Sequence, residues 1–144
     1  MFYFIAGEYI SGPDNRSYRL HTQKVTWPDA KKICESENSH LAFDDTPKTH
    51  TFISQKYGHF SYVWLGASST INGRWTWLNG NPVFTSYWDT GEPNSIDDIE
   101  NCLNTNQHGA KGKWNDASCR GYKFMFLCQK DNTKGMMIKE TFYM

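Results

Sequence analysis

The sequence predicts a single domain in which two helices and several short strands support a long irregular segment. A length of 144 residues fits one domain and is enough to bury a core. Helix start signals occur at residues 26–29 and 44–47. Between residues 79 and 113, Gly, Pro, Asn, Asp and Thr dominate. So long an irregular segment in a compact domain is usually functional or disordered, and the aromatic residues within positions 84–88 argue against disorder.

The first helix is predicted over residues 26–37, after two short strands. Aromatic and β-branched residues predict an initial strand or hairpin arm at 2–10 and a second strand at 17–21, with turn chemistry at 11–15 between them. Thr26 is the expected N-cap, since proline and aspartate follow it in the first turn. A stripe at helical spacing is expected in the core: Trp27, Ala30, Ile33 and Cys34.

The second helix is predicted to open at residues 44–47 and to run to about residue 57, with Pro47 near its first position and Gly58 as its stop. A short strand at 41–43 precedes it. Further strands are expected after it, in chain order at residues 62–67, 74–78, 113–117 and 124–129. In the last of these, Phe124, Phe126 and Cys128 alternate with Met125, Leu127 and Gln129, so each set lies on its own face.

Charge and hydropathy exclude several kinds of partner. Lys and Arg together number 15, as do Asp and Glu, so no net field favours nucleic acid or an anionic membrane. No apolar run approaches the length of a membrane span, so membrane insertion is not expected. The motifs of serine hydrolases, metalloproteases and phosphate-binding loops do not occur, and we expect the protein not to be an enzyme.

Four cysteines allow three disulfide pairings: Cys34, Cys102, Cys119 and Cys128. The absence of a CxxC spacing and of a histidine pair argues against a zinc site. Disulfides imply an oxidising compartment, and we expect an extracellular, secreted protein. The glycosylation acceptor pattern at residues 15–17 agrees with secretion. No signal peptide is visible, so Met1 is interpreted as an added start on a processed chain.

Oxygen-bearing side chains from three short segments suggest a metal site. The candidate ligands are Glu92, Asn94, Glu100, Asn115 and Asp116. Carboxylate and amide oxygens of this kind suit Ca²⁺, which takes six to eight ligands in a flexible geometry. Pro93 stands between the first two ligands, where a rigid backbone would orient both side chains.

An ordered set of motifs resembles a C-type lectin carbohydrate-recognition domain. The motifs are Trp27-Pro28-Asp29-Ala30 with Cys34, His40-Leu41-Ala42, Trp64-Leu65-Gly66, Glu92-Pro93-Asn94, Glu100-Asn101-Cys102, Trp114-Asn115-Asp116 and Phe126-Leu127-Cys128. The match covers roughly residues 4–130, so residues 1–130 are assigned to this domain and 131–144 to a polar tail. The short form, without an additional N-terminal cysteine pair, is similar to invertebrate secreted lectins.

The resemblance implies an α+β double-loop fold with two helices, small antiparallel sheets and a long calcium-binding loop. It implies the disulfides Cys34–Cys128 and Cys102–Cys119 and a cis peptide between Glu92 and Pro93. It also implies that the five candidate ligands hold Ca²⁺ and contact the sugar. His108, in the extended segment 104–113, is a further candidate sugar contact.

The Glu-Pro-Asn order resembles family members that take mannose, N-acetylglucosamine or fucose through vicinal hydroxyls. One calcium site is expected, because the family's auxiliary site would fall on neutral residues: Ser68, Ser69, Asn72 and Ser95. Asp97 and Asp98 would be needed to restore a second, weaker site. The expected partners are glycans or glycoproteins, and an oligomer is possible.

Two other functions stay open. In one, the domain is a lectin-like protein-binding module in which calcium only orders the loops. In the other, the segment 104–113 sets a galactose-type specificity. Glycan binding measured with and without a calcium chelator separates the lectin from the protein-binding module.

Overall fold

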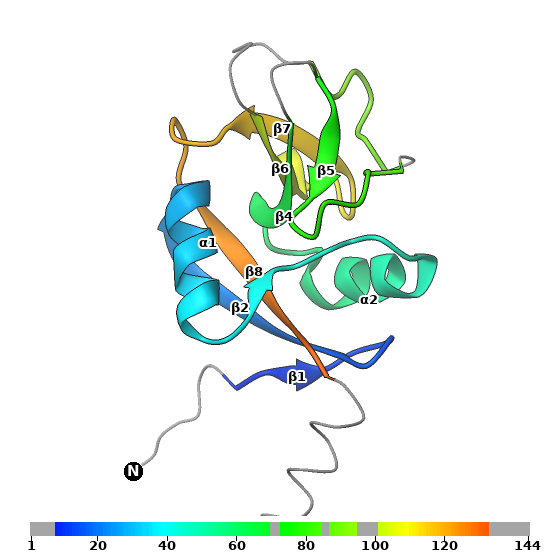
Figure 1. Cartoon of the computed structure of the whole chain (residues 1–144). Helices are drawn as coiled ribbons and strands as arrows, with labels where there is room; N and C mark the ends of the chain where they lie inside the picture. Colours follow the sequence, from blue (N-terminus) through cyan, green and yellow to red (C-terminus); the bar gives the residue numbers. More distant parts are fainter. Residues whose placement is uncertain (1–7, 70–72, 85–86, 95–100, 133–144) are drawn as a thin grey trace, which may run out of the picture.

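A computed structural model describes residues 8–69, 73–84, 87–94 and 101–132 of the chain (Figure 1). The strands are β1 (Ile10–Ser11), β2 (Arg16–Val25), β3 (His40–Leu41), β4 (Val63–Ser69), β5 (Trp75–Trp77), β6 (Asn101–Thr105), β7 (Trp114–Ser118) and β8 (Phe124–Asp131). The helices are α1 (Trp27–Ser36), α2 (Pro47–Tyr57) and a short 3-10 turn, η1 (Gln107–Gly109). The two helices were both predicted, and their bounds agree with the expectation to within a residue or two.

The strands form one connected sheet in the order β1-β2-β8-β4-β6-β7, with β3 paired to β8 and β5 paired to β4. Small antiparallel sheets were expected, and these strand pairs are antiparallel except β4 with β8, which pair in parallel and link the two halves. The reason is that β8 is a shared strand, with β2 on one side and β4 on the other. In Figure 1, β5, β6 and β7 gather at the end of the molecule opposite β1.

Local signals account for both helices. The Thr26 hydroxyl accepts a hydrogen bond from the Asp29 backbone N–H at 3.4 Å, and α1 buries Trp27, Ala30 and Cys34. Likewise, the Thr46 hydroxyl accepts from the Thr49 N–H at 3.1 Å at the start of α2. Such N-caps satisfy backbone donors that the first turn leaves unpaired. Each helix therefore begins where its capping residue stands.

β6 was not predicted, because its residues lie within a segment that was expected to be irregular. Its polar side chains are buried: Asn101, Asn104 and Thr105 are each no more than 4% exposed. Asn104 Nδ2 donates to the Asn115 backbone carbonyl of β7 at 3.3 Å, and Thr105 Oγ1 donates to the Lys113 carbonyl at 3.2 Å. These hydrogen bonds offset part of the cost of burying polar groups in this inner strand, although Asn104 Oδ1 has no hydrogen-bond partner among the described residues.

Two groups of buried side chains form the core on either side of β4 and β8. One is rich in aromatic rings and contains Trp77, Trp114 and Leu127. The other packs α1 against Trp64 and Phe126 and contains all four cysteines. The disulfides are Cys34–Cys128 and Cys102–Cys119, the pairing that the resemblance implied. No helix in the described part of the chain is long and apolar enough to cross a membrane.

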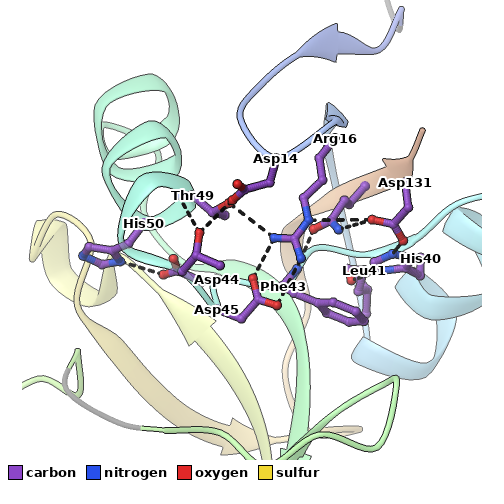
Figure 2. Close-up of polar contacts among 12 residues, drawn as sticks. Asp14, Arg16, His40, Leu41, Phe43, Asp44, Asp45, Thr49, His50 and Asp131 are labelled. Carbon is purple, nitrogen blue, oxygen red and sulfur yellow. Dashed lines mark hydrogen bonds and ion pairs between the residues drawn. The ribbon is translucent and has the colours of Figure 1, made fainter. Parts of the chain in front are cut away.

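A polar network links the start of β2, the segment before α2 and the end of β8, as Figure 2 shows. Arg16, at the start of β2, donates to both carboxylate oxygens of Asp45 at 2.6 and 3.1 Å. Its guanidinium also lies 3.7 Å from Asp131, at the end of β8, and His40 lies 2.6 Å from the same carboxylate.

Because β8 includes Asp131, the predicted tail from residue 131 begins in a strand. Residues 133–144 and the predicted strand residues 2–7 lie outside the described residues.

Candidate functional site

The candidate ligands meet because one loop segment runs along the edge of β7. The Trp114 backbone N–H donates to the Tyr87 carbonyl at 2.7 Å, and the Asp89 N–H donates to the Trp114 carbonyl at 2.9 Å. These bonds form a parallel bridge between Trp88 and Trp114. The segment then turns at Gly91, whose φ of +83° is one that glycine adopts readily. The residues that follow the turn are thereby placed beside the two residues that follow Trp114.

A direct hydrogen bond connects the two segments: the Asn94 backbone N–H donates to Asp116 Oδ1 at 3.0 Å. Within the first segment, Asn94 Nδ2 lies 3.5 Å from Glu92 Oε2. The Glu92–Pro93 peptide is cis, as expected. Asn115 and Asp116 are mostly covered, at 8% and 7% exposure. Four of the five predicted ligands therefore lie together, and the fifth, Glu100, lies outside the described residues.

The electrostatics of Glu92 favour a cation at this position. Burial raises the pKa of Glu92 to about 7, and the neighbouring Asp116 carboxyl adds to the shift. Glu92 Oε1 is buried and has no hydrogen-bond partner among the described residues. A buried carboxylate oxygen without a donor carries a desolvation cost that a metal ion would remove. The donor set, with acidic and amide oxygens and no sulfur or imidazole, fits Ca²⁺.

A hollow of about 240 Å³ opens beside these residues. Its polar lining consists of Glu92, Asn94, Asn101, Gln107, Asn115 and Asp116. Its apolar lining consists of Tyr62, Ala117, Tyr122 and Phe124. The site therefore has a polar end, where the acids gather, and an aromatic wall.

A buried carboxylate lies behind the site. Asp44 Oδ2 accepts from the Trp114 indole Nε1–H at 2.9 Å and from His50 Nδ1–H at 2.8 Å. The His50 ring stacks on Tyr87 with centroids 3.5 Å apart, and Figure 2 shows His50 directed at Asp44. Asp44 thus connects α2 to Trp114, the residue that immediately precedes the predicted ligands Asn115 and Asp116.

His108 does not line the hollow, but it contacts Tyr62, which does. It is exposed on η1, with a left-handed φ of +51°. Its ring nitrogens lie 2.9 and 3.1 Å from the Tyr62 hydroxyl, which belongs to the aromatic wall. The structure does not bring His108 among the predicted ligands.

Only some of the residues expected at an auxiliary calcium site are described. Ser68 and Ser69 lie in β4, whereas Asn72, Ser95, Asp97 and Asp98 lie outside the described residues.

Sequence reasoning missed the aromatic wall and the buried carboxylate. Tyr122 follows a cysteine in a loop, and Tyr62 precedes a strand, so no local pattern connects them. Asp44 stands before the N-cap Thr46 and was interpreted only as part of a helix start. One feature of the sequence could have revealed Asp44. It directly follows the apolar run Leu41-Ala42-Phe43, and an acid buried at the end of a covered strand requires a hydrogen-bond partner.

Comparison with known proteins identifies the relatives of this chain. The sequence matches the Lectin C-type domain family over residues 23–130. A human protein, C-type lectin domain family 17, member A, is 33% identical over 119 residues, covering 81% of this chain and 30% of that protein. C-type lectin lectoxin-Lio3 of Erythrolamprus poecilogyrus is 34% identical over 130 residues, covering 85% of this chain and 80% of that protein. The chain thus spans less than a third of the human relative.

Solved structures share the fold. The mouse scavenger receptor C-type lectin carbohydrate-recognition domain has a TM-score of 0.75 at 26% identity, covering 87% of this chain and 94% of that one. The cow C-type carbohydrate-recognition domain of CD23, in the presence of GlcNAc2Man3 oligosaccharide, has a TM-score of 0.74 at 26% identity. That match covers 89% of this chain and 95% of the cow chain. The α+β fold predicted for the chain, with its two helices and two disulfides, is confirmed.

Proposed function

We propose that this chain, which belongs to the C-type lectin domain family, binds carbohydrate through a calcium ion held by Glu92, Asn94, Glu100, Asn115 and Asp116. One observation carries the proposal: Glu92, Asn94 and Asp116 meet at one hollow, where Glu92 Oε1 is buried without a hydrogen-bond partner. The cow relative whose structure was determined in the presence of an oligosaccharide supports the choice of ligand class. We propose glycans or glycoproteins outside the cell as the ligands, in keeping with two disulfides.

Donor and acceptor chemistry defines how the site would hold a sugar. When bound, the calcium ion supplies coordination positions that accept lone pairs from two neighbouring hydroxyls. Glu92 offers a carboxylate that accepts a hydroxyl proton, and Asn94 offers an amide that donates to a hydroxyl oxygen. Asn115 and Asp116 supply a second amide and a second acid from β7. By its Glu-Pro-Asn order we assign the site to equatorial vicinal hydroxyls, as in mannose, N-acetylglucosamine and fucose.

Ser54, His50 and Asp44 lie in a row, as the serine, histidine and aspartate of a hydrolytic triad do. Their geometry nevertheless indicates a structural role. Ser54 Oγ lies 3.5 Å from His50 Nε2, at the limit of hydrogen bonding, and His50 donates to Asp44. A Cβ added to Gly112 would come within 2.5 Å of Ser54 Oγ, so the Gly112 backbone lies close to this hydroxyl. The same Asp44 oxygen also accepts from Trp114. We therefore propose that the protein binds its ligand without transforming it.

A glycan-binding screen with and without a calcium chelator tests the proposed function. We expect binding to mannose-, N-acetylglucosamine- or fucose-bearing glycans in calcium, and its complete loss in excess EDTA. Readdition of calcium should restore binding, which controls for damage to the protein. Undiminished glycan binding in EDTA would refute the metal-dependent site, and binding to proteins alone would indicate the protein-binding module.

Selectivity should change when the order of donor and acceptor is exchanged. The double substitution Glu92→Gln with Asn94→Asp conserves size and total charge, so calcium should remain bound. Mannose should then bind about tenfold or more weakly, because unpaired polar groups in a partly desolvated contact cost about 1–3 kcal/mol. Competition assays with free mannose and galactose measure the change. Mannose inhibition equal to that of the parent, with calcium bound, would show that these residues do not select the sugar.

Acidification should release calcium, and with it the sugar. Because the pKa of Glu92 is raised from 4.5 to about 7, protons compete with the metal throughout the interval below pH 7. At limiting calcium, affinity should fall by about tenfold per pH unit there. The free energy of unfolding of the metal-free protein should change in the opposite direction and decrease as the pH rises from about 4.5 to 7. The reason is that folded Glu92 holds its proton more tightly than unfolded Glu92 does. Calorimetric calcium titrations at several pH values, with Glu92→Gln as the matched control, measure this, and equal pH slopes in both proteins would contradict it.

A further inference from the structure

We propose that Asn15 is a modification site that carries an N-linked glycan, attached while the chain is unfolded and before β2 pairs with β8. The segment Asn15-Arg16-Ser17 is the only Asn-X-Ser or Asn-X-Thr pattern in the full sequence. The modification depends on passage of the chain through the secretory pathway. It does not depend on calcium or on sugar binding.

The turn between β1 and β2 presents Asn15 to solvent. Asn15 is exposed, and its side chain has no hydrogen-bond partner among the described residues. Backbone hydrogen bonds close the turn instead: the Arg16 N–H donates to the Pro13 carbonyl at 3.2 Å, and the Gly12 N–H donates to the Arg16 carbonyl at 2.8 Å. Asp14 and Asn15 each have a φ of +58°, a region in which aspartate and asparagine are enriched. A substituent on the Asn15 amide therefore costs the turn no contact.

The side chains on either side of Asn15 are directed away from solvent. Asp14 Oδ2 accepts from Thr49 Oγ1 at 3.2 Å, and Arg16 donates to Asp45 Oδ1 at 2.6 Å, as Figure 2 shows. In Figure 1, β1 lies at the end of the molecule opposite β5, β6 and β7. A bulky, hydrated glycan needs such a surface position, and here it would stay clear of the calcium ligands.

The acceptor hydroxyl is covered in the folded domain. Ser17 is 8% exposed, and its strand pairs it with Ser11 on one side and Lys130 on the other. The acceptor pattern requires both the asparagine amide and this hydroxyl, so the folded chain should be a poor substrate. Lys130 and the Cys34–Cys128 disulfide, which spans 94 positions, are completed late in synthesis. The growing chain therefore offers the pattern unpaired before the sheet can cover it.

The donor would be an oligosaccharide joined to a lipid through pyrophosphate. The Asn15 amide nitrogen forms a bond to the first carbon of the oligosaccharide, and the bond from that carbon to the pyrophosphate oxygen breaks. The lipid pyrophosphate leaves with the electron pair of the broken bond, and the amide gives up one proton to the transferase. The transfer involves no oxidation or reduction.

The first experiment is peptide mapping of the full chain after secretion from cultured animal cells behind an added signal peptide. We expect a heterogeneous increase in mass at Asn15, removed by peptide N-glycanase with conversion of this asparagine to aspartate. Asn15→Asp, which suits the left-handed turn, and Ser17→Ala should each lose the increase, and Ser17→Thr should keep it. Asn38→Asp is the matched control, since Asn38 is also exposed, has a φ of +59° and lies outside the acceptor pattern.

The second experiment tests the order of modification and folding. Unmodified protein from bacteria is offered to purified oligosaccharyltransferase and lipid-linked donor, once folded with its disulfides and once reduced and unfolded. Only the unfolded chain should gain a glycan. Unmodified Asn15 in the secreted chain would overturn the site, and this parent measurement decides the matter even if the variants are not secreted. Equal modification of the folded and unfolded chains would overturn the proposed order.

Discussion

Asp116→Ala should abolish sugar binding while leaving the fold intact. Asp116 accepts the backbone N–H of Asn94 at 3.0 Å and adjoins Glu92, so it both anchors the loop and supplies negative charge. Changes outside the coordination shell of a metal already cost about 10–100-fold in affinity, and removal of a direct ligand should cost at least as much. We therefore expect a loss of more than about a hundredfold in calcium and sugar affinity. Calcium calorimetry and glycan binding on the purified variant measure it.

Asp29→Ala is the matched control for this substitution. Asp29 is an exposed acid in the first turn of α1, and its loss removes the same charge and the same atoms. It should alter stability by about 1 kcal/mol or less and leave ligand binding unchanged. Glu100→Ala should behave like Asp116→Ala. Sugar affinity retained in Asp116→Ala, with a normal melting temperature, would mean that the metal site is misplaced.

Asp44→Ala should have the largest effect on stability among the polar substitutions considered. Asp44 is 2% exposed and accepts from both the Trp114 indole and His50. Its removal leaves both donors without that partner, and leaving a buried donor unpaired costs about 1–3 kcal/mol for each group. Thermal and urea denaturation measure the loss in free energy of unfolding.

Asp44→Asn separates hydrogen bonding from charge. It keeps an oxygen that accepts from Trp114 but removes the negative charge that faces His50, so its cost should lie well below that of alanine. Asp45→Ala is a control from the adjacent position, where the carboxylate pairs with Arg16 near the surface. Because surface ion pairs contribute about 0–1 kcal/mol, Asp45→Ala should be the mildest. Equal stabilities for Asp44→Ala and Asp45→Ala would contradict a structural role for the buried carboxylate.

The parts of the fold that depend on neighbours in sequence were predictable. Thr26 and Thr46 cap their helices through bonds that span three residues, and such a signal can be recognised in any sequence. The position of Glu92 and Asn94 beside β7 was predictable only through resemblance to a family. The backbone bonds between Tyr87, Asp89 and Trp114 that place them there join residues more than twenty positions apart.

The strand β6 and the burial of Asp44 could not be predicted, because both depend on polar residues in buried positions. The residues of β6 are polar by composition, yet Asn104 is fully buried because Asn115 of the next strand supplies an acceptor. Likewise, Asp44 is buried because Trp114, 70 positions later, donates to it. Hydrophobic patterning identifies strands by their apolar face, and it cannot identify a polar side chain whose partner comes from a distant segment.

Calcium titration in the absence and presence of saturating ligand tests the central claim most directly. If sugar hydroxyls coordinate the ion held by Glu92, Asn94, Glu100, Asn115 and Asp116, calcium and sugar must strengthen each other's binding by the same factor. We predict one calcium per chain, bound more tightly in the presence of the mannose-type glycan that binds best. Calcium affinity that is unchanged by saturating sugar, or sugar binding without any calcium uptake, would contradict the account.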